Sequence, residues 1–377
     1  MKKKIGFVIE SLQLGGAEKS LVTLLQHLDD SKYEIDLIYF HPDGFFKEMV
    51  PKTVHQIVLD FPKISFFERL KYAFKKKTVK NYHNAQLFWP LMEPHLENFE
   101  KEYDIAVAYN QGFATYFTQK FISAETKYAW VNTDYRKAGY NIGFDKDFYA
   151  DFKKVVCVSP ENKAGFTKVA DSAGLDIEVE IIKDISDEDF IRKQAGKEMK
   201  ISFQKDKINV VSVGRLVDYK GFEMAVKSCS VLVKKGIDVN WYIIGEGAQR
   251  NELEKLIKEN QLKNHFYLPG ADANPYPYIK NCDIYVQTSL FEGLGLTVIE
   301  AAMLHKPIVC TSFPTVFSIL KDNETGLIVE MNPESISAGI ERLINDKELK
   351  NRLTENLKNQ KNNDTEITMK KVEELLK

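Results

Sequence analysis

The sequence predicts an α/β protein made of two doubly wound domains that face each other, with the active site in the cleft between them. Short apolar runs alternate with segments of helical spacing along most of the chain. The apolar runs are continuous, which is typical of strands buried on both faces of a parallel sheet. A length of 377 residues exceeds one ordinary domain and fits two. Sheets of this kind bind ligands at the carboxyl ends of their strands.

The first series of elements opens with a strand at 5–9, which passes through the turn Leu14-Gly15-Gly16 into a helix at 17–28. Ser159-Pro160 follows the last strand of this series and indicates a helix start, with serine as N-cap and proline in the first turn. The strands between these two points are predicted at 35–40, 54–59, 105–109, 128–131 and 155–158.

A second series begins near Asn209. Its strands are predicted at 209–213, 239–244, 266–268, 284–287 and 308–310, and its helices at 222–235, 250–260, 296–304 and 333–344. The polar stretch 183–207 is interpreted as the linker between the two series. We therefore expect an N-terminal domain over 1–185 and a second domain over 186–350. A C-terminal helix in 351–377 is expected to pack back toward the first domain.

The composition is that of an ordinary globular protein, with 44% hydrophobic and 28% charged residues. A net charge of −2 gives no sign of a nucleic-acid partner. The four cysteines show no CxxC spacing, so neither a zinc site nor a disulfide framework is indicated, and we expect buried, reduced thiols. The N-terminal apolar run is too short for a signal peptide, and no stretch approaches the roughly 18 apolar residues of a spanning helix. These features predict a cytoplasmic protein.

The first candidate ligand site is the turn Gly15-Gly16, between a strand and a helix. Glycine allows close backbone approach, and the N-terminus of the following helix offers free N–H groups to an anion. A tight turn without any ligand would use the same residues, so this pair carries little weight by itself.

The second candidate site is the segment VGRLVDYKG at 213–221, which follows a strand and precedes a helix. Arg215 and Lys220 leave the carboxyl end of that strand. An arginine fork and a lysine point charge can neutralise a diphosphate without a metal. A solvated surface pair is the alternative interpretation.

The third candidate site is the segment FEGLGLTVIE at 291–300, in which two glutamates flank a glycine-rich turn that opens a helix. Gly293 and Gly295 leave backbone N–H groups bare to phosphate or sugar oxygens. Glu292 and Glu300 suit sugar hydroxyls, because a carboxylate accepts several hydrogen bonds. A capped helix with two exposed acids is the alternative.

Together these motifs resemble glycosyltransferase family 4, whose members have the GT-B fold. The resemblance rests on G-G-A-E at 15–18, G-R-x4-K-G at 214–221 and E-x7-E at 292–300, with support from 283–300 and 323–327. Residues 41–125 match little. The resemblance implies a retaining, metal-independent hexosyltransferase that needs no cofactor. It also implies a nucleotide-sugar donor, by family frequency a UDP-sugar. The domain over 186–350 would be the nucleotide-sugar-binding domain, and the domain over 1–185 the acceptor-side domain. The acceptor would be a glycan, lipid-linked or protein-linked molecule in bacterial surface polysaccharide or capsule synthesis.

The family also implies roles for single residues. Arg215 and Lys220 would hold the donor diphosphate, Glu300 the ribose hydroxyls, and Glu292 hydroxyls of the donor sugar. Gly15 and Gly16 would close on the diphosphate from the other domain. Backbone N–H groups would contact sugar and phosphate at Gly293, Leu294, Gly295, Leu296 and Thr297. The leaving phosphate is commonly held to accept the acceptor's proton, so the site needs charge stabilisation more than a dedicated base.

Asn132 departs from the family, because relatives often carry a histidine at this position. An asparagine side chain can hydrogen-bond a sugar hydroxyl, but it cannot carry charge or a proton. Either the donor sugar differs, or activity is weaker, or catalysis is lost. We count Asn132 with Glu292, Arg215 and Lys220 as the catalytic candidates. A milder departure is Asp184, where relatives often have asparagine.

Two other functions stay open at this point. A catalytically inactive GT-B subunit that binds or chaperones a partner transferase is favoured by Asn132, but intact Arg215, Lys220, Glu292 and Glu300 argue against it. Another GT-B enzyme, such as a nucleotide-sugar epimerase or a phosphorylase, is the third interpretation. Epimerases should not show this E-x7-E context, and no cofactor-lysine site is visible.

The segment 61–80, FPKISFFERLKYAFKKKTVK, carries seven basic residues and one acid. Phe66, Phe67, Leu70 and Phe74 recur in it at helical spacing. A basic helix with an aromatic apolar face predicts docking on anionic lipid, and so a peripheral location at the inner face of the plasma membrane. A core-packed helix with a solvated basic face is the alternative.

Overall fold

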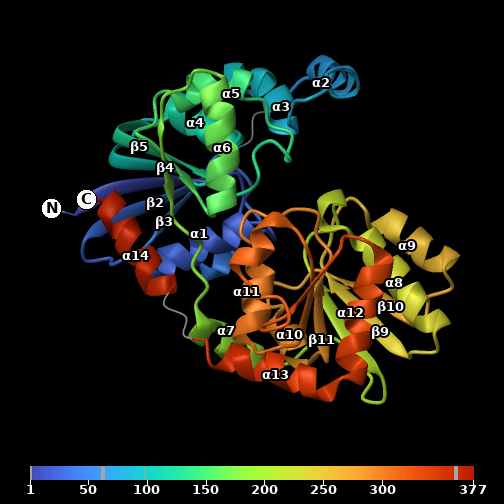
Figure 1. Cartoon of the computed structure of the whole chain (residues 1–377). Helices are drawn as coiled ribbons and strands as arrows, with labels where there is room; N and C mark the ends of the chain where they lie inside the picture. The colour runs from blue at the N-terminus through green and yellow to red at the C-terminus, as the bar shows by residue number, and fades with distance from the viewer. Residues whose placement is uncertain (1, 61–63, 98, 361–363) are drawn as a thin grey trace. The chain divides into compact units, whose positions relative to one another are not determined.

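The structure is a computed structural model that describes residues 2–60, 64–97, 99–360 and 364–377. The chain divides into two compact units. The first comprises Met1–Ile185 together with Asp364–Lys377, and the second comprises Ser186–Asn363. Figure 1 shows the elements of both units.

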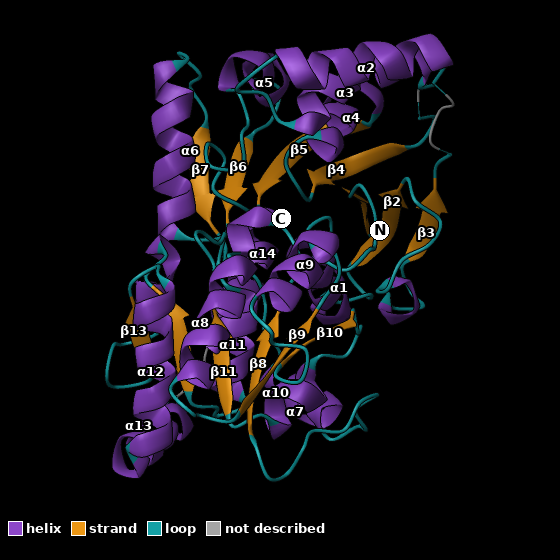
Figure 2. Ribbon diagram, turned by 90° about the vertical axis from the view of Figure 1, so that its right-hand side faces the viewer, coloured by secondary structure: helices purple, strands orange, loops and turns teal. Residues whose placement is uncertain are grey.

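The first unit contains a sheet of seven parallel strands in the order β3-β2-β1-β4-β5-β6-β7. The strands are β1 (Lys3–Val8), β2 (Tyr33–Tyr39), β3 (His55–Val58), β4 (Glu102–Ala108), β5 (Ser123–Val131), β6 (Lys154–Cys157) and β7 (Glu178–Ile181). The helices are α1 (Gly16–His27), α2 (Phe66–Thr78), α3 (Asn84–Met92), α4 (Phe113–Phe121), α5 (Ile142–Tyr149), α6 (Pro160–Ser172) and α14 (Asp364–Leu375). Helices cover both faces of the sheet (Figure 2).

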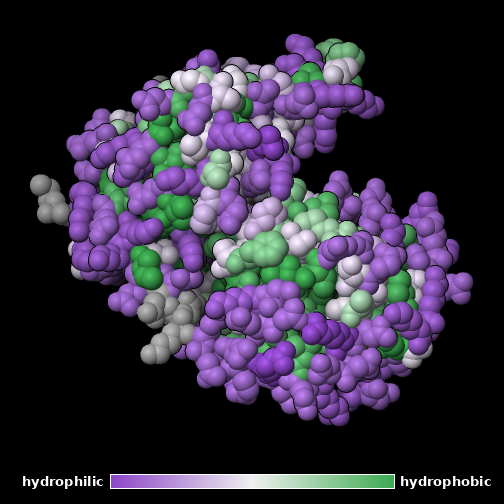
Figure 3. Space-filling view, in the orientation of Figure 1, coloured by the Kyte–Doolittle hydropathy of each residue, from purple (hydrophilic) through white to green (hydrophobic). Residues whose placement is uncertain are grey.

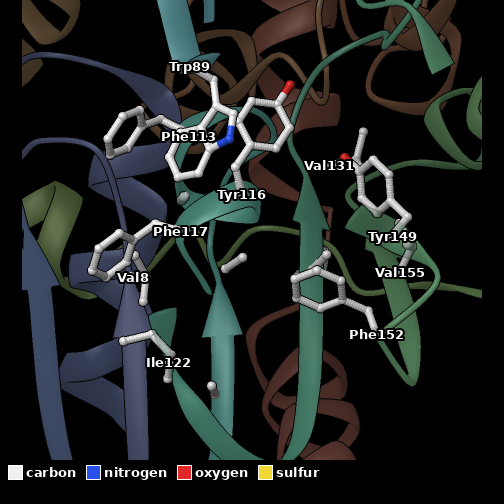
Figure 4. Packing of buried hydrophobic residues seen from close by; sticks show 14 of the residues in the cluster. Val8, Trp89, Phe113, Tyr116, Phe117, Ile122, Val131, Tyr149, Phe152 and Val155 are labelled. Carbon is white, nitrogen blue, oxygen red and sulfur yellow. The ribbon is translucent and has the colours of Figure 1, made fainter. Parts of the chain in front are cut away.

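An aromatic core fills one face of this sheet. Trp89 of α3 packs against Phe113 and Tyr116 of α4, with ring centroids 5.1 and 5.3 Å apart. These rings lie over small and branched side chains of the strands, among them Val8 and Val131 (Figure 4). Large rings on the helices and small residues on the strands let the two layers approach closely, as close packing of an interior requires.

The second unit contains a sheet of six parallel strands in the order β10-β9-β8-β11-β12-β13. The strands are β8 (Ile208–Val213), β9 (Val239–Ile244), β10 (Phe266–Gly270), β11 (Ile284–Gln287), β12 (Ile308–Thr311) and β13 (Leu327–Val329). The helices are α7 (Glu188–Ala195), α8 (Phe222–Lys234), α9 (Arg250–Glu259), α10 (Tyr276–Asn281), α11 (Leu296–Met303), α12 (Pro333–Asn345) and α13 (Lys347–Lys358). Val210 and Val211, adjacent in β8, belong to separate core clusters on the two faces.

The sequence located most strands to within a few residues, and Ser159 caps α6 as predicted, accepting from the Asn162 N–H at 3.1 Å. The prediction of a linker over 183–207 is wrong. Helix α7 lies within this stretch and buries Ile191 and Ala195, each 2% exposed. The stretch is polar overall, but these two apolar residues are four apart and share one helix face.

All four cysteines are buried and free, as expected from the sequence. Burial raises the pKa of Cys157, Cys229 and Cys282 to about 12, so these thiols are unreactive near neutral pH. In the part of the chain that the structure describes, no helix is long and apolar enough to cross a membrane.

Helix α14 belongs to the first unit although it follows the whole second unit in sequence. Val372 and Leu376 are each 1% exposed. Lys371 Nζ donates to the Ile181 carbonyl at 2.8 Å, and Asp364 pairs with Lys183 at 3.3 Å. The chain therefore passes twice between the units, once after Ile185 and once before Asp364.

Candidate active site

The second sheet has its switch point between β8 and β11, which are neighbours in the sheet although three helices and two strands separate them in sequence. The loops that follow these two strands, 214–221 and 288–295, leave from the same edge of the parallel sheet. Ligands of open α/β sheets bind at the carboxyl ends of the strands at such a point. The two strongest sequence motifs therefore meet where the fold favours a ligand site.

Two hydrogen bonds and one close backbone approach join the two loops. The Leu290 N–H donates to the Tyr219 carbonyl at 2.7 Å, and Thr288 Oγ1 donates to the Lys220 carbonyl at 2.9 Å. Gly221 has φ of 64°, and a Cβ there would lie 2.2 Å from the Thr288 carbonyl oxygen. Only glycine fits at this crossing, because the left-handed conformation and the missing side chain are both required.

Lys220 and Glu292 form an ion pair across the two loops, with 2.7 Å between Nζ and Oε1. Their side chains are only 12% and 10% exposed. The same Glu292 oxygen accepts from Ser289 Oγ at 2.6 Å and from Gln287 Nε2 at 3.1 Å. Three donors thus fix one carboxylate oxygen in a site from which solvent is largely excluded.

Gln287 orients this carboxylate from within the sheet. Tyr285 Oη and Thr297 Oγ1 donate to Gln287 Oε1 at 2.7 and 3.3 Å. The amide nitrogen is thereby directed toward Ser289 and Glu292. Thr297, predicted to contact the donor through its backbone, also supports Glu292 indirectly through its hydroxyl.

Helix α11 begins directly after this pair. Gly295 precedes it with φ of 88°, and a Cβ at Gly295 would lie 2.8 Å from Ile319 Cδ1. The N–H groups of Leu296 and Thr297 lie in the first helical turn, where N–H groups lack intrahelical acceptors and favour an anion. Glu300 is 1% exposed on this helix, and Leu294 is 5% exposed. The alternative of a capped helix with two exposed acids is therefore wrong, because the Glu292 side chain is only 10% exposed as well.

Arg215 is exposed, and its Nη2 donates to Tyr219 Oη at 3.0 Å. The Tyr219 ring stacks on Phe291, with centroids 4.9 Å apart and planes at 26°. Tyr219 therefore supports Arg215 with its hydroxyl and the second loop with its ring. Tyr219 and Phe291 lie inside the two motifs, but neither is among the site residues predicted from the sequence.

A third loop, after β9, closes against the first. A Cβ at Gly245 would lie 1.8 Å from the Gly214 carbonyl oxygen, and one at Gly247 would lie 2.4 Å from that of Leu216. The sequence analysis missed these two glycines. The signal was present as G-E-G directly after the strand 239–244, where backbone must approach backbone.

The candidates of the first unit lie at the ends of its own strands. Helix α1 begins at Gly16, and Gly15 is its N-cap in extended conformation. The Asn132 N–H follows β5 and donates to Gln111 Oε1 at 3.0 Å. The Asn132 side-chain amide is closed off from solvent, and neither of its polar atoms has a hydrogen-bond partner among the described residues.

A buried carboxyl that the sequence analysis missed holds the loop containing Asn132. Asp145 of α5 is fully buried and accepts from Tyr116 Oη at 2.6 Å, from Gln86 Nε2 at 2.8 Å, and from Tyr135 Oη. Burial raises the pKa of Asp145 to about 6, although these hydrogen bonds act in the opposite direction. Gln86 also donates to the Asn141 carbonyl at 2.8 Å, so the loop 132–141 is anchored along its length.

Asp184, the second departure from the family, is also buried. It accepts from Ser20 Oγ of α1, and that hydroxyl lies 2.9 Å from Tyr109 Oη. Burial raises the pKa of Asp184 to about 7. Among the described residues, no three histidine, cysteine or acidic side chains are placed to hold a metal ion.

The sequence profile of the family described as Glycosyl transferases group 1 matches residues 194–360, which include all the second-unit candidates. One curated relative is the N-acetylgalactosamine-N,N'-diacetylbacillosaminyl-diphospho-undecaprenol 4-alpha-N-acetylgalactosaminyltransferase of Campylobacter jejuni. It is 27% identical over 361 residues, covering 92% of each chain.

Two solved structures match the fold over 99% of each chain at 16% identity. One is Anabaena HepE in complex with UDP and glucose, at a TM-score of 0.71. The other is Staphylococcus aureus TarM, in a complex that includes UDP, at a TM-score of 0.70. The predicted GT-B fold is thereby confirmed, and the predicted resemblance to glycosyltransferase family 4 is supported by the group 1 glycosyltransferase match over residues 194–360.

Proposed function

We propose that this glycosyltransferase moves a hexose, with retention of configuration, from a UDP-sugar to a glycan or lipid-linked acceptor in bacterial surface polysaccharide synthesis. The observation that carries the proposal is the Lys220–Glu292 pair, held at the switch point beside the N-terminus of α11. A buried cation, a buried carboxylate and free helical N–H groups match a diphosphate joined to a sugar. Relatives support the donor and the acceptor class, since two matched structures hold UDP and the Campylobacter enzyme acts on a diphospho-undecaprenol.

In this proposal Lys220 and Arg215 neutralise the charge that grows on the departing diphosphate. Glu292 accepts hydrogen bonds from the donor sugar, and Glu300 from the ribose. The N–H groups of 293–297 contact sugar and phosphate. Preorganised charges of this kind stabilise a transition state without reorganising when it forms. The second unit would thus bind the donor, and the first unit, with 364–377, would serve the acceptor.

Gly15, Gly16 and Asn132 complete the proposed donor and acceptor machinery from the first unit. The inaccessible, unpartnered amide of Asn132 supports a ligand there, because buried polar atoms normally have partners. We place the enzyme in the cytoplasm, at the inner face of the plasma membrane, where a lipid-linked acceptor is available.

A panel of nucleotide sugars tests the proposal, with thermal stabilisation and release of free nucleotide followed in parallel. A UDP-sugar that stabilises the protein and is slowly hydrolysed supports it, and the anomeric configuration of a transferred product shows whether the sugar is retained. Stabilisation without turnover favours the inactive subunit that Asn132 suggests, and Asn132→His is then the variant to assay. If no nucleotide stabilises the protein, the proposed donor site is wrong.

A further inference from the structure

Helix α2 presents an apolar face that the rest of the first unit leaves uncovered. Its side chains Phe66, Phe67, Leu70 and Phe74 are 71%, 74%, 51% and 69% exposed. In Figure 3, apolar atoms lie among polar ones on this helix at the upper right. None of the residues of α2 is buried.

The helix is nevertheless anchored in a defined rotation. Tyr72 packs edge-to-face on Phe88 of α3, with centroids 5.2 Å apart, and Glu68 accepts from His95 Nε2 at 3.0 Å. Ser65 caps the helix with a reciprocal capping box to Glu68. Glu68 and Tyr72 are four residues apart, so they define the inner face. The fold therefore fixes which side of α2 points outward.

A helical wheel places the apolar residues opposite this anchor. At about 100° per residue, Phe66, Leu70, Phe74 and Phe67 fall on one arc centred roughly opposite the Glu68–Tyr72 line. Exposed basic residues accompany this arc: Arg69 and Lys76 lie beyond one edge of it, Lys71 lies beyond the other, and Lys77 lies within it. Lys75 is also exposed but lies nearer the anchored face. Lys63 of the predicted basic segment lies outside the described residues.

Within the described part of the chain, the charge on this helix is not neutralised locally. Glu68, the single acid in α2, already serves the N-cap and His95. These interactions, the His95 hydrogen bond first, lower the pKa of Glu68 to about 2. An apolar arc with cations at its edges matches an anionic lipid surface, in which acyl chains contact the rings and headgroups contact the ammonium and guanidinium groups.

We propose that the outward face of α2 docks the protein on the surface of an anionic lipid bilayer, with the helix axis parallel to the membrane plane. The aromatic rings enter the headgroup–acyl boundary, and the flanking basic residues contact lipid phosphates. This inference stands on α2 alone and goes beyond the proposed reaction.

Fluorescence provides a direct test, because the three tryptophans of the chain are 1%, 2% and 0% exposed. In a Phe67→Trp variant the new indole is the exposed one, and Tyr72→Trp is the matched control on the inner face. Vesicles of phosphatidylglycerol and phosphatidylcholine should shift the emission of the exposed indole to the blue, and brominated lipids should quench it. The control should respond weakly. Unchanged emission of the Phe67→Trp protein with anionic vesicles would overturn the proposal.

Vesicle sedimentation tests the two contributions separately. Replacing Lys71, Lys75, Lys76 and Lys77 by glutamine should weaken binding by at least about tenfold, as should raising the salt from about 0.05 to about 0.5 M. The same change at Lys227, Lys255, Lys258 and Lys263, all exposed on the second unit, is the control. Phe66→Ser with Phe74→Ser should also release the protein, whereas Phe317→Ser, at a residue 63% exposed, should not.

Two results would contradict a lipid surface. The first is that all these variants bind vesicles as tightly as the native protein. The second is that the native protein does not bind vesicles but self-associates, and that Phe66→Ser with Phe74→Ser abolishes this self-association. The second result would assign the face to another copy of the chain. The α2 variants should leave UDP affinity unchanged, and Glu300→Gln should leave vesicle binding unchanged. A wrong docking proposal can therefore be distinguished from a wrong donor-site proposal.

Discussion

Lys220 Nζ lies 2.7 Å from Glu292 Oε1, in a site where both side chains are about nine-tenths buried. The pair keeps both charges compensated before a ligand arrives. A diphosphate at Lys220 would share or replace this contact and leave Glu292 with its donors Ser289 and Gln287. The ion pair therefore links phosphate binding to the group proposed to hold the sugar.

Lys220→Ala should weaken UDP binding by about ten- to a hundredfold, the range of a hydrogen bond to a charged group. Uridine, which lacks the diphosphate, should bind both proteins equally. Titration calorimetry measures both ligands, and Lys227→Ala, at a residue 50% exposed, is the matched control. An equal loss for UDP and uridine would show that Lys220 does not contact the diphosphate.

Glu300→Gln should remove the preference for a ribose. The side chain is 1% exposed, and glutamine keeps its volume while losing the charge that strengthens hydroxyl hydrogen bonds. The native protein should bind UDP more tightly than 2'-deoxy-UDP, and the variant should bind the two with nearly equal affinity. Melting temperature serves as the control for folding. If the ratio of UDP affinity to 2'-deoxy-UDP affinity is the same in the variant as in the native protein, the ribose does not contact Glu300.

Gly221→Ala should damage the donor site through the backbone. Gly221 and Gly236 both have positive φ, 64° and 78°, but a Cβ at Gly236 would meet no atom within 4 Å. Each substitution should cost about 1–2 kcal/mol for the left-handed conformation. Gly221→Ala must in addition push away the Thr288 carbonyl, so it should lose more stability and most of its UDP affinity. If the two variants lose equal stability and equal UDP affinity, the contact between Gly221 and the Thr288 carbonyl does not determine the structure of the donor site.

Asp145 should make the first unit less stable as pH rises from about 4 to about 6. Its pKa is about 6 in the folded protein against an ordinary 3.8, so the folded state holds the proton more tightly across this window. The free energy of unfolding falls there by on the order of 3 kcal/mol and levels off above.

Asp145→Asn should remove this slope. Denaturant unfolding at several pH values gives the free energy of unfolding of the native and variant proteins, and the contribution of Asp145 is the difference between the two curves. The native curve alone is not enough, because Asp184, with a pKa of about 7, contributes a slope of the same sign. Tyr135→Phe, which removes one donor to Asp145, is the companion variant and should raise the pKa of the carboxyl further. Parallel native and Asp145→Asn curves between pH 4 and 6 would contradict the assignment.

The sequence predicted what depends on local pattern. Buried parallel strands are continuous apolar runs, and the loops at 214–221 and 291–300 are continuous motifs, so both were readable from neighbouring residues. Helix α7 was missed because its buried face consists of few apolar residues in a polar stretch.

The support of the site was hidden for another reason. Gln86, Tyr116, Tyr135 and Asp145 are far apart in sequence and meet only after α3, α4 and α5 have packed. Gln287 resembled the polar end of a strand, and its role depends on Tyr285 and Thr297. Interactions of this kind follow from tertiary packing and leave no spacing to recognise.

The return of α14 to the first unit has a consequence for biosynthesis. Residues 364–377 are translated after every residue of the second unit, so the ribosome delivers the whole second sheet before the first unit receives α14. Until then the surfaces that Val372, Leu375 and Leu376 cover stay open to solvent. The unit whose synthesis begins first is therefore the last to have all of its residues available for folding.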